Sequence, residues 1–141
     1  MKDTDILKEI NKASKYGING INLTLQKAID SNFKNVLYAQ KDEYENIYNR
    51  SKDLLIEKNQ SSEDLDPLEK AMSWMSIQMS TLTNASNSKL AEILIQGNDM
   101  GIIKGQKLLN SPMSKDSTTQ NLIKDFIHLQ QENIEGLKKY L

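Results

Sequence analysis

The sequence contains no cysteine, a single histidine and a single arginine among its 141 residues. The absence of cysteine excludes disulfide bonds, thiolate metal sites and a cysteine nucleophile. The histidine, His128, falls on an outward helical face, so no serine, histidine and acid are arranged for nucleophilic catalysis. Because Arg50 is the only arginine, forked recognition of a phosphate is almost unavailable. These absences argue against enzymes that use a cysteine or serine nucleophile, a thiolate metal site or an arginine that binds phosphate.

The sequence also lacks an excess of one charge and any long apolar run. Its 18 basic and 19 acidic residues give no electrostatic reason to bind nucleic acid or an anionic membrane. No apolar run approaches the roughly 18 residues of a membrane span, and the N-terminal residues lead into an amphipathic helix rather than a signal peptide. The glycines lie at helical spacing, which does not match a phosphate-binding loop. We therefore expect a cytoplasmic protein without a cofactor.

The dominant pattern is the recurrence of apolar residues at intervals of three and four. It predicts a single helical domain over residues 1–141, with long helices at about 4–30, 33–58, 85–110 and 116–140. The short connections within each pair predict antiparallel hairpins. The long connection between the pairs can travel the full length of a bundle.

A short fifth helix is predicted at about 67–82, within this connection. Asp66 is suited to the N-cap, Pro67 to the first helical position and Glu69 to a capping box. The predicted helix carries a stripe of apolar side chains flanked by Trp74: Leu68, Met72, Met75, Met79 and Leu82. Methionine fills irregular gaps, so this stripe is expected to cover the bundle. The alternative is a docking face for a partner.

Glycines recur along one stripe of the third long helix, at Gly97, Gly101 and Gly105, and beside the core stripe of the first helix, at Gly17 and Gly20. Each glycine inside a helix costs about 1 kcal/mol relative to alanine, so the pattern needs a cause. The favoured cause is tight helix packing, because native interiors rarely leave voids. The alternative is an interior space for a small ligand.

Four polar side chains are predicted to face the interior, and all are neutral: Gln40, Ser51, Gln130 and Asn133. Neutral side chains buried together are best explained by a hydrogen-bond network that fixes the register of the helices. In the ligand alternative, the glycine-lined space would lie beside this network.

Residues 90–103 (LAEILIQGNDMGII) and 131–141 (QENIEGLKKYL) resemble segments of small ferritin-like proteins of low-GC, often spore-forming, bacteria. Four long helices with a long central connection are also similar to the ferritin-like bundle. The resemblance implies an all-α, ferritin-like four-helix bundle: two up-down hairpins joined by a long crossover that contains the fifth helix. It also suggests a spore- or coat-associated role.

A ferritin-like dimetal site would require a glutamate from each of two helices and Glu-x-x-His from each of the other two. Asp125 and His128 imitate the second spacing with aspartate in place of glutamate, and Glu45 begins the corresponding segment of the second helix. All three fall on predicted outward faces. We therefore expect no metal site.

The sequence thus favours a non-catalytic structural or interaction protein that self-associates as a homo-oligomer. Two alternatives stay open: a carboxylate-bridged dimetal protein with oxidase or iron-handling activity, and a small-molecule carrier that uses the glycine-lined interior.

Overall fold

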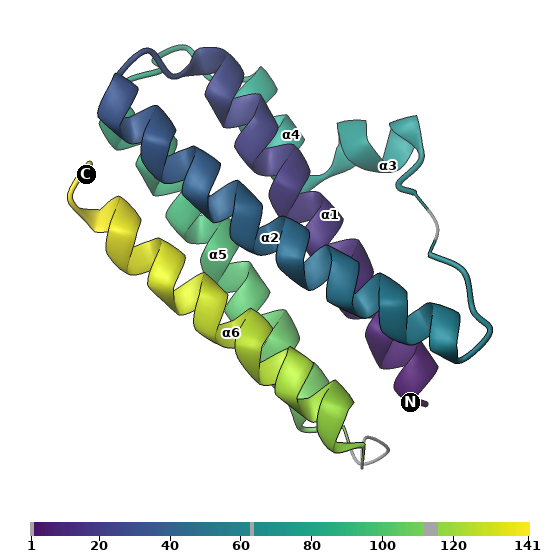
Figure 1. Ribbon diagram of the computed structural model, residues 1–141. Helices are drawn as coiled ribbons and strands as arrows, with labels where there is room; N and C mark the ends of the chain where they lie inside the picture. Colours follow the sequence, from purple (N-terminus) through teal and green to yellow (C-terminus); the bar gives the residue numbers. More distant parts are fainter. Residues whose placement is uncertain (1, 63, 112–115) are drawn as a thin grey trace.

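The computed structural model describes residues 2–62, 64–111 and 116–141. Four long helices dominate it: α1 (Asp3–Lys27), α2 (Ser31–Glu57), α5 (Asn87–Leu109) and α6 (Ser117–Lys138). Two short helices, α3 (Pro67–Met72) and α4 (Trp74–Ser80), lie in the connection between α2 and α5. Figure 1 shows α1 and α2 as one antiparallel hairpin and α5 and α6 as the other.

The chain reverses sharply between α1 and α2. Asp30 caps α2 by accepting a hydrogen bond from the backbone N–H of Phe33 at 2.8 Å. This side chain satisfies one of the free amide groups at the start of the helix and so fixes the turn. At the same end of the bundle the ring of Phe33 packs on Tyr140, with ring centroids 4.7 Å apart.

The long connection returns the chain to the end of the bundle where α2 began, so α5 runs in the same direction as α2 (Figure 1). Ion pairs between the hairpins are consistent with this arrangement. Arg50 of α2 meets Asp125 of α6 at 2.8 Å, and Lys104 near the end of α5 meets Glu9 near the start of α1.

The connection differs from the continuous helix predicted over 67–82. The predicted capping box forms. The Asp66 side chain accepts a hydrogen bond from the backbone N–H of Glu69 at 2.7 Å, and the Glu69 side chain accepts one from the backbone N–H of Asp66 at 3.4 Å. The helix then breaks at Ser73, whose backbone is extended and whose hydroxyl caps α4. The break separates α3, which stands away from the bundle, from α4, which packs on it (Figure 1).

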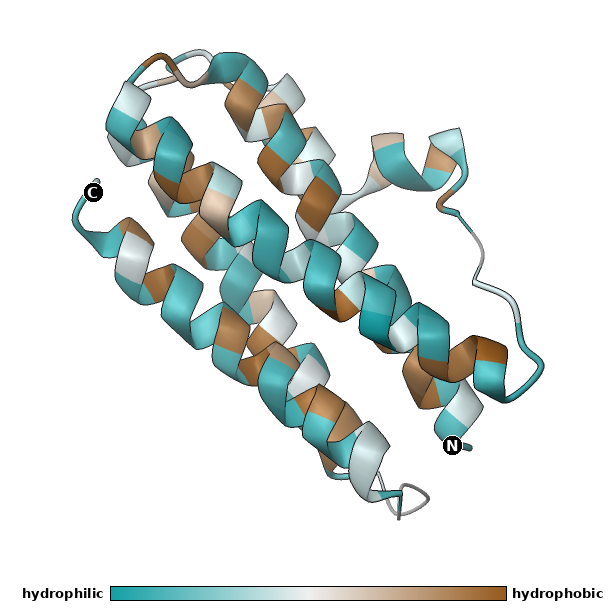
Figure 2. Ribbon diagram, in the orientation of Figure 1, coloured by the Kyte–Doolittle hydropathy of each residue, from teal (hydrophilic) through white to brown (hydrophobic). Residues whose placement is uncertain are grey.

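The core lies between the apolar faces of the four long helices, with polar faces outward (Figure 2). Its largest fully buried side chains come from all four and from α4: Phe33, Phe126, Ile6, Leu7, Ile10, Ile21, Leu37, Leu55, Met79, Leu90, Ile93 and Leu122. Among the helices of the described residues, none is both long and apolar enough to cross a membrane.

Candidate ligand-binding site

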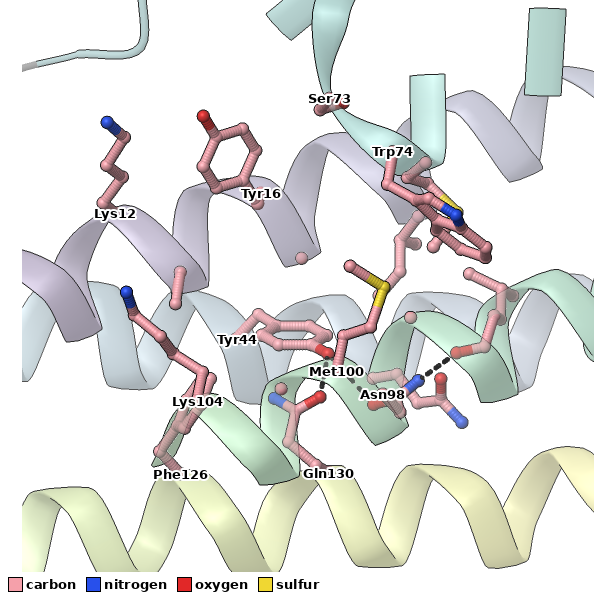
Figure 3. A pocket seen from close by; sticks show the side chains of 18 of the residues that line it. Lys12, Tyr16, Tyr44, Ser73, Trp74, Asn98, Met100, Lys104, Phe126 and Gln130 are labelled. Atoms are coloured by element: carbon pink, nitrogen blue, oxygen red, sulfur yellow. Dashed lines mark hydrogen bonds between the residues drawn. The ribbon is translucent and has the colours of Figure 1, made fainter. Parts of the chain in front are cut away.

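A cluster of neutral polar side chains occupies the middle of the bundle. The hydroxyl of Tyr44 on α2 lies 2.8 Å from Gln130 Oε1 on α6 and 3.1 Å from Asn98 Oδ1 on α5 (Figure 3). Asn133 on α6 donates to the same Asn98 oxygen at 3.1 Å, and Asn98 Nδ2 donates to the Leu94 carbonyl at 2.7 Å. This network links three long helices through residues that are each at most 5% exposed.

The four polar residues expected to share one network belong to two clusters. Gln40 donates to the Asn133 carbonyl at 3.4 Å and so joins Gln130 and Asn133. Ser51 lies elsewhere, where it accepts from Asn11 Nδ2 at 2.9 Å, while Asn11 Oδ1 accepts from Ser62 at 2.8 Å.

Tyr44 and Asn98 were not among the residues predicted for the network. Asn98 carried a usable signal, because it continues a four-residue series through the buried Leu90 and Leu94. A polar residue in such a series faces the core and needs a partner there. The neighbouring Gly97 belongs to a different stripe of the same helix.

Burial raises the pKa of Tyr44 to about 12, although its hydrogen bonds with the amide side chains favour the ionised form. The phenol is therefore neutral throughout the physiological range. Since Asn98, Gln130 and Asn133 are also uncharged, the centre of the bundle carries no net charge of its own.

Because the pKa of Tyr44 is raised in the folded state, the free energy of unfolding should fall with pH above about pH 10. The folded state holds the phenol proton more tightly than the unfolded state, so this stabilisation is complete below about pH 10 and lost as pH rises toward 12. We expect the wild type to lose about 2 kcal/mol more than Tyr44→Phe between pH 9 and 11.5, measured by urea unfolding. Parallel pH profiles for the two proteins would contradict this expectation.

The glycines make room for side chains of other helices rather than for another backbone. A Cβ on Gly17 would run into the Tyr44 ring, and a Cβ on Gly101 would lie 2.8 Å from Gln130 Cδ. Met75 of α4 fits against two glycines at once, with its Cγ 2.9 Å from the position of a Cβ on Gly20 and its Cε 2.6 Å from that on Gly97. Gly105 meets Ile127 in the same way, at 2.6 Å.

A cavity of about 500 Å³ opens between α1, α4 and α5 and reaches the polar network. Gly17, Gly97 and Gly101 line it, together with apolar side chains of the bundle and the connection: Ala13, Ile21, Trp74, Met75, Leu94, Met100 and Phe126. Figure 3 shows Tyr44, Asn98 and Gln130 on one side and Lys12, Tyr16 and Lys104 away from them. The glycine stripe therefore provides both side-chain contacts and the wall of a cavity.

The residues of the predicted methionine face separate between the two short helices. Met72 on α3 is 66% exposed, whereas Met79 on α4 is 1% exposed. Trp74 and Met75 are partly buried and line the cavity. The face therefore serves partly as core, partly as cavity wall and partly as exposed surface.

The three candidate metal ligands lie apart from this centre. Asp125 is exposed and pairs with Arg50, and His128 is exposed and lies 3.4 Å from Glu132 of its own helix. Glu45 is partly exposed on α2, next to the inward-facing Tyr44. Within residues 2–62, 64–111 and 116–141, no three histidine, cysteine, aspartate or glutamate side chains gather as a metal ion would require.

A known structure shares this arrangement of helices. The chain superimposes with a TM-score of 0.76 on a structure described as "A Dodecameric Thioferritin in the Bacterial Domain, Characterization of the Bacterioferritin-Related Protein from Bacteroides fragilis". The match covers 99% of this chain and 86% of the other, at 16% sequence identity. The fold is ferritin-like. The predicted all-α, ferritin-like bundle is thus confirmed, while no protein-family model and no curated protein sequence matches the chain.

The centre of this ferritin-like bundle does not fit the dimetal site typical of the fold. Gln130 and Asn133 have the three-residue spacing of Glu-x-x-His and both face inward, but each is a neutral amide. Asn98 on α5 and Tyr44 on α2 face them. On α1, Gly17 lies against the Tyr44 ring and has no side chain that could bind a metal. Iron and manganese are held by carboxylate oxygens and imidazole, which this set lacks.

Proposed function

We propose that this ferritin-like protein is a non-catalytic binding protein that holds a small, mainly apolar molecule in the cavity at the centre of its bundle. The observation that carries the proposal is the cavity of about 500 Å³, whose walls are mainly apolar and whose neutral polar groups converge on the side away from Lys12 and Lys104. Sites for small molecules in proteins have this size and composition.

The glycines support the same function. Gly97 and Gly101 each cost helical stability. Met75 and Gln130 occupy the positions that a Cβ would take at these two glycines, and both glycines also line the cavity. A bundle selected only for stability would fill such a space, because voids forfeit packing contacts.

Filling the cavity should therefore weaken binding. We expect naphthalene, a purely apolar probe, to shift the indole N–H resonance of Trp74, the only tryptophan in the chain and a residue of the cavity wall. Gly97→Leu should weaken this binding at least about tenfold, because its side chain competes for the space beside Met75.

Gln96→Leu is the matched control, since Gln96 precedes Gly97 on the same helix and is exposed. This variant should bind naphthalene as the wild type does. If naphthalene left the Trp74 resonance unchanged, or bound equally to the wild type and Gly97→Leu, the proposed function would be wrong.

Self-association is a second element of the proposal. Leu68 and Met72 on α3 are 71% and 66% exposed, and Ile103 on α5 is 56% exposed. These exposed apolar side chains are available to an interface between copies. The similar structure is described as dodecameric, which supports the same idea. Light scattering during gel filtration would measure the assembly state directly.

The dimetal alternative is tested separately. Metal analysis of protein purified without a histidine tag should give less than about half an equivalent of iron or manganese per chain, because the inward side chains are amides and a phenol. A stoichiometric content that His128→Ala removed would favour the iron-handling function instead. The cytoplasmic location and the spore association are expectations from the sequence.

A further inference from the structure

Gln130 is a deeply buried polar residue of the cavity whose side-chain nitrogen donates no hydrogen bond within the described part of the chain. The residue is 1% exposed and lines the cavity. Its amide oxygen faces the Tyr44 hydroxyl, and Figure 3 shows its nitrogen directed away from Tyr44. Among the hydrogen bonds of the described residues, none is donated by this nitrogen. A ligand group that accepts a hydrogen bond from this nitrogen would therefore complete the partners of the amide.

The hydrogen bonds around Tyr44 also leave one polar atom of Gln130 free. A phenol hydroxyl carries one proton, yet Tyr44 lies within hydrogen-bond distance of two carbonyl oxygens, those of Asn98 and Gln130. The orientation of Asn98 is fixed, because its nitrogen donates to the Leu94 carbonyl. Turning the Gln130 amide by half a turn lets its nitrogen donate to Tyr44 and directs its oxygen to the other side. In either orientation Gln130 offers the cavity one free polar atom, a donor or an acceptor.

The surroundings of Gln130 exclude a charged partner. Its neighbours Tyr44 and Asn98 are neutral, and burial raises the pKa of Tyr44 to about 12. The charged side chains that line the cavity are Glu9, Lys12 and Lys104, and each is paired and partly exposed: Lys104 with Glu9, and Lys12 with Glu69 at 3.1 Å. An ionic group beside Gln130 would therefore be desolvated without a counter-ion, which is strongly unfavourable.

We propose that the ligand of this cavity is a neutral, mainly apolar molecule with one hydrogen-bonding group, such as an alcohol, phenol or amide, which binds to the side-chain amide of Gln130. This inference rests on the proposed binding function. The ring of Phe126, the indole of Trp74 and the thioether of Met75 surround the apolar part of the ligand. A hydroxyl suits the site well, because it can donate or accept and so matches either orientation of Gln130.

The test uses four probes of one shape on the full chain at pH 7: naphthalene, 2-naphthalenemethanol, 2-naphthoate and 2-naphthylmethylammonium. Binding is measured by calorimetry and located by the indole N–H resonance of Trp74. We expect the alcohol to bind about tenfold more tightly than naphthalene, which corresponds to one net hydrogen bond. Both ions should bind more weakly than naphthalene.

Two variants identify Gln130 as the partner. Gln130→Met removes the amide and keeps a side chain of similar length, so the alcohol should lose its advantage while naphthalene binds as before. Unchanged naphthalene binding also shows that this variant is folded. Gln130→Glu should shift the preference toward the ammonium probe, because it supplies the missing counter-ion.

The possible outcomes test separately the role of Gln130, the neutral class of ligand and the proposed binding function. If naphthalene and the alcohol bind equally well at Trp74 and Gln130→Met changes neither, the role of Gln130 is overturned while the binding function stands. If 2-naphthoate or the ammonium probe binds best to the wild type, the neutral class of ligand is overturned. If none of the four probes affects Trp74, the proposed function itself fails.

Discussion

Replacing Gly105 with leucine should lower the free energy of unfolding by about 2 kcal/mol. Gly105 is buried, and a Cβ there would lie 2.6 Å from Ile127 Cγ1 and 3.3 Å from Phe126 Cδ1. Overpacking of this kind costs up to about 3 kcal/mol and sometimes more. Leucine is the better helix former by nearly 1 kcal/mol, which offsets part of this cost. Urea unfolding at neutral pH measures the difference.

Lys107→Leu provides the matched control, since Lys107 lies two residues later on the exposed face of the same helix. We expect its free energy of unfolding to stay within about 0.5 kcal/mol of the wild type. If Gly105→Leu were as stable as this control, the contact between α5 and α6 at Gly105 would have to be looser than the structure shows.

Replacing Met79 with aspartate should cost at least about 3 kcal/mol. Met79 is 1% exposed and packs in the core from α4. The substitution loses the burial of a methionine, worth about 1.5–3 kcal/mol, and places an unpaired carboxylate against apolar groups. A large fall in the thermal unfolding midpoint is the expected observation.

Met72→Asp separates the two halves of the connection. Met72 belongs to the same stripe in the sequence, but it is 66% exposed on α3. Its substitution should change the stability of the isolated chain by less than about 0.5 kcal/mol. Equal losses for Met72→Asp and Met79→Asp would instead favour one continuous helix covering the bundle.

The sequence alone was sufficient to predict the four long helices and much of what faces inward. Apolar periodicity depends only on the geometry of a helix, so Leu37, Leu90 and Leu122 could be placed in the core without any knowledge of their partners. Capping is equally local, which is why Asp66, Pro67 and Glu69 predicted the start of α3 correctly. The inward direction of Gln130 and Asn133 followed from the same periodicity.

Tertiary structure decided what these inward residues meet. The stripe from Leu68 to Leu82 has helical spacing throughout, yet it breaks at Ser73 because only the part from Trp74 onward finds bundle surface to cover. The partners of Tyr44 come from two helices, 54 and 86 residues away along the chain, so spacing within one helix could not reveal them.

The cavity likewise depends on distances between helices. Glycines at 97 and 101 are compatible with close packing or with an open space, and the sequence pattern is the same in both cases. The outcome was set by the side chains of Met75 and Gln130, which lie against these two glycines beside the cavity. Such volume is a property of four helices and a connection packed together, and no single helix encodes it.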